Sequence, residues 1–199
     1  ASNTYLMAGI HPSGSQGRAG GASALGGRNL APVIDPGRPA TRLVTLDTVP
    51  ELASLVRANR EFLAPFEPVR GDDYFTVEGQ RDLVETALAR HVEGATLPHV
   101  ILDGDGAVVG RVTLNEIVRG PFQSCHLNYW LSSAANGRGL ATAAVRDIVR
   151  VAFEELGLHR IQAGTLIDNV RSQRVLERTG FIRFGVAPTY LSIAGRWQD

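Results

Sequence analysis

The chain has 199 residues, of which 44% are hydrophobic, and its 20 basic side chains balance 20 acidic ones. This length predicts one domain with a full core, and the balanced charge gives no bulk attraction to nucleic acid or to an anionic membrane. The single cysteine, Cys125, excludes an intrachain disulfide framework and favours a reducing, cytoplasmic location. No apolar run reaches the length of a membrane span, and no export signal precedes the first helix.

The N-terminal segment differs in composition from the rest. Residues 8–40 are dense in Gly, Ala, Ser and Pro and offer few large apolar side chains to a core. Such a composition predicts a disordered tail, so residues 1–40 are expected to lie outside the folded domain. Because Met7 is the only methionine, residues 1–6 are interpreted as vector-derived, which the mass of the natural product would test. Residues 41–199 are expected to form a single domain.

The first half of that domain predicts a strand, two helices and a meander. A β-branched run at 41–46 indicates a strand, and amphipathic helices follow after residue 47 and over 77–94. Strand signals then occur at 99–104, 107–118 and 124–133. The first two are joined by Asp-Gly-Asp-Gly at 103–106, a strong hairpin turn, so we expect an antiparallel meander.

The second half predicts a crossover. A long amphipathic helix over 140–156 is followed by a strand at 159–167 and a shorter helix that ends near Gly180. Residues 189–193 and 196–199 predict the arms of a final hairpin. Because the long helix connects two strands, these strands are expected to lie side by side and parallel. The predicted fold class is α+β, with a mixed, mostly antiparallel central sheet and helices on both faces.

A glycine-rich turn, Ala-Asn-Gly-Arg-Gly-Leu-Ala at 135–141, lies between the third meander strand and the long helix. Free N–H groups at such a helix N-terminus can bind phosphate. The turn lacks the Gly-Lys-Ser/Thr ending of a P-loop, and a dinucleotide fingerprint read from Gly137 would need Gly or Ala in place of Thr142. From the turn alone, a phosphate site and a plain helix cap stay equally open.

The order of elements and the sequence Asn-Gly-Arg-Gly-Leu-Ala at 136–141 resemble the GNAT superfamily of N-acetyltransferases. Its fingerprint is Gln/Arg-x-x-Gly-x-Gly/Ala, from which Asn136 departs. Segments 59–70, 117–131, 159–181 and 189–199 resemble the ribosomal-protein-alanine N-acetyltransferases of the RimJ/RimL type, RimJ most. That family continues past the final Trp-x-Asp into another strand, so the chain is expected to lack its last strand.

The resemblance implies that acetyl-CoA is the acetyl donor, bound where the parallel strands splay apart, and that no metal is needed. It implies a backbone cradle for the pyrophosphate at Asn136, Gly137, Arg138, Gly139, Leu140 and Ala141. The amides of Leu131 and Ser132 are the expected donors to the pantetheine arm or the oxyanion, and Asn169 the expected contact to that arm. Arg138 and, less so, Arg174 are candidates for the phosphates, against plain solubility roles.

Acetyl transfer to an amine needs a proton acceptor and benefits from a donor to the leaving thiolate. By resemblance Ser172 is the candidate acid, although Asp168, Asn169 or Ser172 could serve only to cap the short helix. Glu116 and His126 are candidate bases that the sequence does not rank. Tyr129 and Trp130 alternate faces of one strand, so one of them is expected in the core.

The predicted function is therefore N-acetylation of the N-terminal alanine of a ribosomal protein, by direct attack of the amine in a ternary complex. The expected partners are acetyl-CoA, that protein's N-terminal peptide and the ribosome, with no membrane and no direct nucleic-acid binding. Two alternatives stay open: acetylation of a small amine or antibiotic, and a non-catalytic module that binds acetyl-CoA or the ribosome. A peptide acceptor requires an open groove beside residues 62–75.

Overall fold

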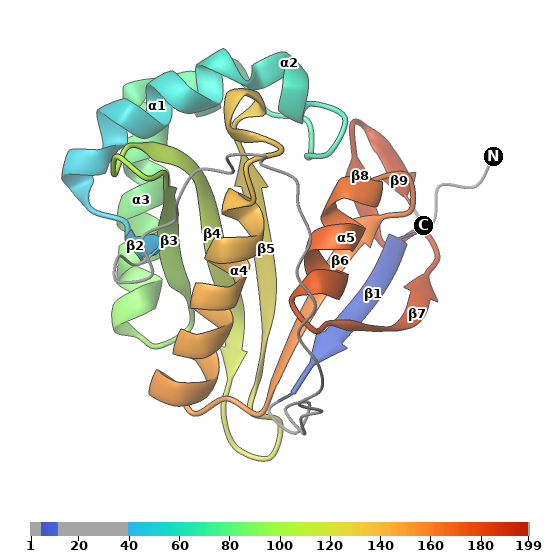
Figure 1. Cartoon of the computed structure of the whole chain (residues 1–199). Coiled ribbons are helices and arrows are strands. Elements are labelled where there is room, and N and C mark those ends of the chain that lie inside the picture. The colour runs from blue at the N-terminus through green and yellow to red at the C-terminus, as the bar shows by residue number, and fades with distance from the viewer. Residues whose placement is uncertain (1–4, 12–39, 199) are drawn as a thin grey trace, which may run out of the picture.

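The structure, a computed structural model, describes residues 5–11 and 40–198. Figure 1 shows a central sheet with helices on both faces. The sheet contains β1 (Tyr5–Ile10), β2 (Thr41–Leu43), β3 (Leu97–Leu102), β4 (Val108–Val118), β5 (Ser124–Leu131), β6 (Arg160–Leu166) and β7 (Ile182–Ala187). A separate hairpin pairs β8 (Leu191–Ile193) with β9 (Arg196–Gln198), as predicted.

The strands of the sheet lie in the order β2-β3-β4-β5-β6-β1-β7. Within the described residues, β5 and β6 are the one parallel pair, and the other neighbours are antiparallel. Parallel pairing runs from Ser124 opposite Arg160 to Leu127 opposite Ala163 and then stops, although both strands continue. The predicted α+β class and the parallel crossover are confirmed, and β5 and β6 separate beyond Leu127.

The helices are α1 (Val49–Ala58), α2 (Arg60–Leu63), α3 (Val77–Val92), α4 (Leu140–Arg150) and α5 (Val170–Arg178), with a 3₁₀ turn, η3, at Asp72–Phe75. The predicted helix 140–156 is α-helical only to Arg150 and then forms a π-helical turn, Val151–Glu155. In that turn the Leu156 N–H donates to the Val151 carbonyl, and Gly157, with φ at +63°, ends the element.

Two apolar layers hold the sheet between its helices. On one face α4 and α5 cover a core that includes Leu127, Leu140, Ile148 and Ile161. On the other face α1 and α3 enclose a smaller core around Leu52. Strand residues alternate between these layers because successive side chains point to opposite faces. The alternation of β5 therefore decides which of its side chains reach the opening between β5 and β6.

The predicted tail is wrong for residues 5–10. They form β1, which lies between β6 and β7 and is antiparallel to both, so the domain includes a segment outside the predicted range 41–199. Ala8 is 3% exposed, and a Cβ at Gly9 would lie 3.0 Å from the Arg160 guanidinium, which explains why small residues fit here. The small-residue composition concealed a strand that becomes evident only when its two partners are known. The rest of the predicted tail, residues 1–4 and 12–39, lies outside the described residues.

Candidate active site

A cavity of about 540 Å³ opens at the separation of β5 and β6. Polar side chains of β4 and β5 line it from one face of the sheet, where Arg111 is opposite Trp130 and Thr113 is opposite Asn128. The loop after α2, helix α3, the start of α5 and strand β8 contribute the other walls. The opening therefore joins the strand gap to the groove beside residues 62–75 that a peptide acceptor would require.

Ser172 lies in this cavity at the N-terminal end of α5. Its Oγ is 2.8 Å from the Tyr129 hydroxyl, and its N–H donates to Asn169 Oδ1 at 3.1 Å. Asn169 therefore caps α5 while it also lines the cavity, so the capping role and a ligand role are compatible. Burial raises the pKa of Tyr129 to about 12, against the opposing effect of its hydrogen bond to Ser172. Tyr129 thus keeps its proton and can donate to Ser172.

The Tyr129–Ser172 pair was missed from the sequence, which left both strand aromatics without a role. The structure packs Tyr129 partly against the core and turns Trp130 toward Arg111 on the other face of β5. Period-2 alternation correctly predicts that the two rings diverge. It does not reveal that a helix residue 43 positions later meets the Tyr129 hydroxyl.

The edge of β5 presents backbone donors to the gap. Ser132, predicted as such a donor, instead gives its N–H to the Val109 carbonyl at 2.8 Å. Because opposite pairs in an antiparallel ladder alternate, the next pair, Leu131 with Gly110, exchanges no hydrogen bonds, and the Leu131 N–H points away from β4. The Tyr129 N–H also points away from β4, and the pairing of β5 with β6 has already ended at Leu127. The available amides are therefore those of Leu131 and Tyr129.

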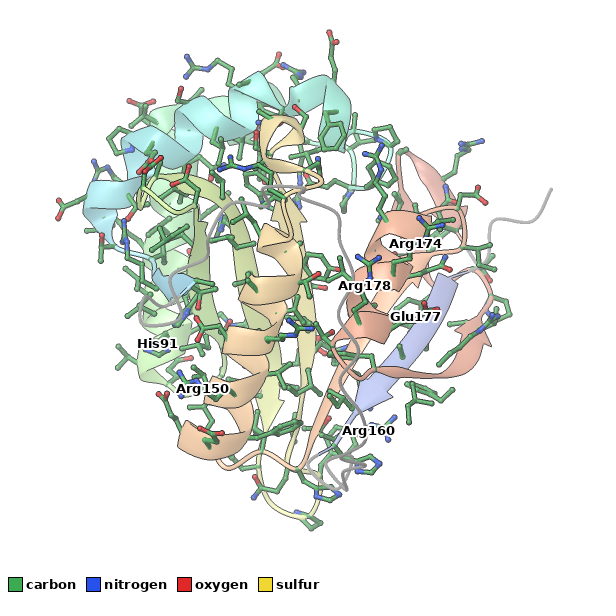
Figure 2. All side chains as sticks on the ribbon, in the orientation of Figure 1. His91, Arg150, Arg160, Arg174, Glu177 and Arg178 are labelled. Carbon is green, nitrogen blue, oxygen red and sulfur yellow. The ribbon has the colours of Figure 1, made fainter. Side chains whose placement is uncertain are left out.

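The glycine turn leads directly into α4. Gly137 and Gly139 have φ of +77° and +78°, a region that other residues adopt only with strain. No side chain caps the helix, so the N–H groups of its first turn are left for a ligand or solvent. Asn136 donates its side-chain amide to the Ser132 and Ser133 carbonyls, so it shapes the turn from within. Arg138 is exposed, as is Arg174 on α5 (Figure 2).

Asn59, which sequence reasoning missed, anchors the start of this turn. Its side chain is buried, with the residue 2% exposed, at the end of α1. Oδ1 accepts from the Ser133 N–H at 2.8 Å and from the Ser132 hydroxyl at 3.3 Å, while Nδ2 donates to the Leu55 carbonyl at 2.8 Å. One side chain thus ties α1 to the residues that connect β5 to the turn.

The two candidate bases lie together, outside the cavity that Ser172 lines. Glu116 Oε2 is 3.9 Å from His126 Nε2, with the Glu116 side chain 70% exposed and that of His126 29% exposed. Glu116 occupies an irregular part of β4 with φ at +51°, and His126 is on the section of β5 that still pairs with β6. Neither residue lines the cavity. Cys125 is fully buried, and burial raises the pKa of its thiol to about 12, which makes it a structural residue.

A group of charged and titratable residues in the cavity was not predicted from the sequence. Glu67 and Arg70 from the loop after α2, Tyr74 from η3 and Arg111 from β4 all line it. Burial raises the pKa of Glu67, and Arg70 and Arg111 partly oppose this. Burial lowers the pKa of Arg111, against Tyr74 and Glu67. Arg111 on β4 is distant in the chain from the other three, so no local motif predicts that the four residues meet.

Neither a metal-binding cluster nor a membrane-spanning helix occurs within the described residues, 5–11 and 40–198. Among them, no group of three or more His, Cys, Asp or Glu side chains could hold a metal ion. Within the same ranges, every helix is too short or too polar to cross a membrane.

Residues 41–182 match the family described as an acetyltransferase (GNAT) domain. The chain belongs to the GNAT acetyltransferase family. This assignment agrees with the separated parallel strands and with the glycine turn at the start of α4.

Several named acetyltransferases are similar to this chain over most of its length. The probable N-acetyltransferase YjcK of Bacillus subtilis is 41% identical over 75% of this chain and 83% of its own length. The [ribosomal protein uS5]-alanine N-acetyltransferase of Escherichia coli is 32% identical over 81% of this chain and 84% of its own. Among solved structures, Mycobacterium smegmatis RimJ in complex with CoA-disulfide has a TM-score of 0.76 and 30% identity, covering 80% of this chain and 79% of that one.

Proposed function

We propose that this protein transfers the acetyl group of acetyl-CoA to the N-terminal α-amine of a ribosomal protein that begins with alanine. The similarity to the uS5-alanine N-acetyltransferase and to RimJ with its CoA disulfide supports the substrate pair. The observation that carries the proposal is the cavity, because Ser172 and Tyr129 meet in it where β5 and β6 separate.

The donor binds along the gap. Its pyrophosphate lies at the amides of the turn from Asn136 to Ala141, where the α4 dipole and the uncapped N–H groups favour an anion. Its pantetheine arm pairs with the Leu131 and Tyr129 amides as an added strand and contacts Asn169. Arg138 and Arg174, both exposed, are the candidates for contacts to the phosphates.

The reaction is a direct attack in a ternary complex. The neutral amine attacks the thioester carbonyl carbon, the C–N bond forms, and the tetrahedral oxyanion accepts a hydrogen bond from the β5 edge. The C–S bond then breaks as the Ser172 hydroxyl, held by its hydrogen bond to Tyr129, donates a proton to the departing sulfur. The proton that the attacking nitrogen sheds passes through solvent and restores Ser172. An α-amine has a pKa near 7.7 to 8.0, so a fraction of the acceptor is already neutral at physiological pH.

Association with the ribosome and a cytoplasmic location remain predictions. The chain's charges balance, so ribosome binding would need a local basic surface.

Thiol release from acetyl-CoA tests the proposed function. The acceptors are a peptide beginning with alanine, the same peptide blocked at its N-terminus, and a panel of small amines that includes spermidine. Release only with the free peptide, with one acetyl group added, supports the function. Release only with a small amine would replace the acceptor, and tight acetyl-CoA binding without transfer to any acceptor would favour the non-catalytic alternative.

A further inference from the structure

The part of the cavity next to residues 62–75 contains an acidic and a basic side chain, Glu67 and Arg111, that form no ion pair with each other. Glu67 and Arg111 influence each other electrostatically, yet in the described part of the chain no ion pair or hydrogen bond engages either charged end. Burying a charge is costly unless another group compensates for it. Such groups in a cavity mark a place where a ligand completes the interactions.

The backbone on both sides of the cavity holds these two residues in place. The Ala194 N–H, in the turn between β8 and β9, donates to the Glu67 carbonyl at 2.9 Å, so the hairpin fastens the loop that carries Glu67. Arg111 lies in the middle of β4, paired on one side with Val100 and on the other with Trp130. The loop and the sheet therefore present one charge each to the same space.

We propose that Glu67 and Arg111 together recognise the acceptor: Glu67 binds its ammonium group and takes the proton, and Arg111 binds the carbonyl oxygen of its first residue. This assignment rests on the proposed function and deepens it. A peptide N-terminus carries an ammonium group and, on the carbon next to Cα, a carbonyl oxygen. An acid and a guanidinium across one cavity match that pair of groups, whereas a polyamine has no carbonyl to offer Arg111.

The surroundings of Glu67 suit proton transfer. The charged and titratable groups around it are Arg70 on its own loop, Tyr74 on η3, Arg111 on β4 and Arg90 of α3, which lines the same cavity. Arg70 also stacks on the Tyr74 ring at 4.7 Å, and its charge partly opposes the effect of burial on the pKa of Glu67. Burial has the largest effect and raises the pKa of Glu67, so its carboxylate is a stronger base than a solvated one.

Two protons must leave the nitrogen of the acceptor's ammonium group during the reaction. The ammonium group gives its first proton to the Glu67 carboxylate, and its nitrogen lone pair then forms the C–N bond. The second proton leaves the nitrogen as the C–S bond breaks and passes through solvent to Ser172, which has given its own proton to the thiolate. Glu67 releases its proton to solvent after each turnover, so the net products are the acetylated amine, free CoA and one proton.

Steady-state kinetics of Glu67→Gln and Arg111→Met test the two roles, with Glu61→Gln and Arg81→Met as matched controls on exposed helix positions outside the cavity. The acceptors are an alanine peptide and its analogue with the first carbonyl reduced to CH₂. Arg111→Met is expected to raise KM for the peptide about tenfold or more and to leave KM for the analogue nearly unchanged. Glu67→Gln is expected to lower kcat about 100-fold.

The pH profile separates a proton-transfer role from a structural one. With Glu67→Gln, kcat/KM is expected to follow the titration of the acceptor amine alone, while the wild type keeps additional activity at lower pH. Equal KM increases for peptide and analogue in Arg111→Met, or an unchanged kcat and pH profile in Glu67→Gln, would overturn the assignment although the proposed function stands.

Equilibrium dialysis of the alanine peptide with the CoA-loaded protein decides the Arg111 role even if the wild type shows no transfer. Weaker binding by Arg111→Met than by Arg81→Met supports the assignment, and equal binding refutes it. Absence of transfer by the wild type would count against the proposed function alone.

Discussion

Replacing Asn59 by Ala should weaken both the fold and the binding of acetyl-CoA. The substitution removes the acceptor of the Ser133 N–H, at 2.8 Å, and of the buried Ser132 hydroxyl, at 3.3 Å. A net hydrogen bond contributes about 1 kcal/mol, and a buried group left without a partner costs about 1 to 3 kcal/mol. The free energy of unfolding should therefore fall by about 2 to 3 kcal/mol, which corresponds to a Tm lower by about 4 to 12 °C.

The functional effect follows from the position of Asn59. Once Ser133 is no longer fixed to α1, the turn at 136–141 loses one of its supports, and KM for acetyl-CoA should rise about fivefold, the equivalent of about 1 kcal/mol. Differential scanning fluorimetry gives Tm, and initial rates at saturating acceptor give KM. Asn59→Asp keeps an acceptor for Ser133, so its Tm should fall while its KM stays near that of the wild type.

Leu52→Ala supplies the control for general destabilisation, because Leu52 is fully buried on α1 but belongs to the opposite core. It should lower stability by about 2 to 5 kcal/mol without a change in KM for acetyl-CoA. The reasoning is refuted if Asn59→Ala leaves both quantities unchanged, or if Leu52→Ala raises KM to the same extent.

Three further predictions concern the fold. Ala8→Asp places an unpaired carboxylate in β1, the described partner of β7, and should lower the free energy of unfolding in urea by about 3 kcal/mol or more; an unaltered transition would mean that β1 does not pack here. Cys125 should not react with a thiol probe at pH 8 until the protein unfolds, and rapid labelling of the native protein would contradict its burial. Burial lowers the pKa of His99 to about 4, against Asp147, so the unfolded chain binds more protons between pH 4 and 6.5. Stability should thus fall as pH falls through this window, by up to about 1.4 kcal/mol per pH unit, and urea titrations of His99→Gln should lose that slope.

Local patterns were sufficient for the parts of the fold that depend on nearby residues. The helix after Leu140 requires a crossover, which predicted the parallel neighbours β5 and β6. The glycines at 137 and 139 predicted an unusual turn, and both have positive φ. In each case the determining interactions lie within a few residues or within one supersecondary unit.

The remainder depends on contacts between distant segments. The position of β1 between β6 and β7 is set by strands more than 150 residues later in the chain, and its own small residues gave no strand signal. Which β5 amides face the gap depends on the pairing of β4 with β5. Leu131 and Ser132 were therefore predicted as donors, whereas the structure leaves Leu131 and Tyr129 available. Glu67 and Arg111 share a cavity only because the loop after α2 folds over β4.

The most direct test of the proposed acceptor uses one peptide with two competing amines. A peptide that begins with alanine and contains a single internal lysine is incubated with the protein and acetyl-CoA, and tandem mass spectrometry locates the acetyl group. Acetylation of the α-amine alone is the predicted result, because the neutral fraction of that amine and the carbonyl beside it both favour it. Acetylation of the lysine side chain would contradict the assignment of an N-terminal α-amine as the acceptor.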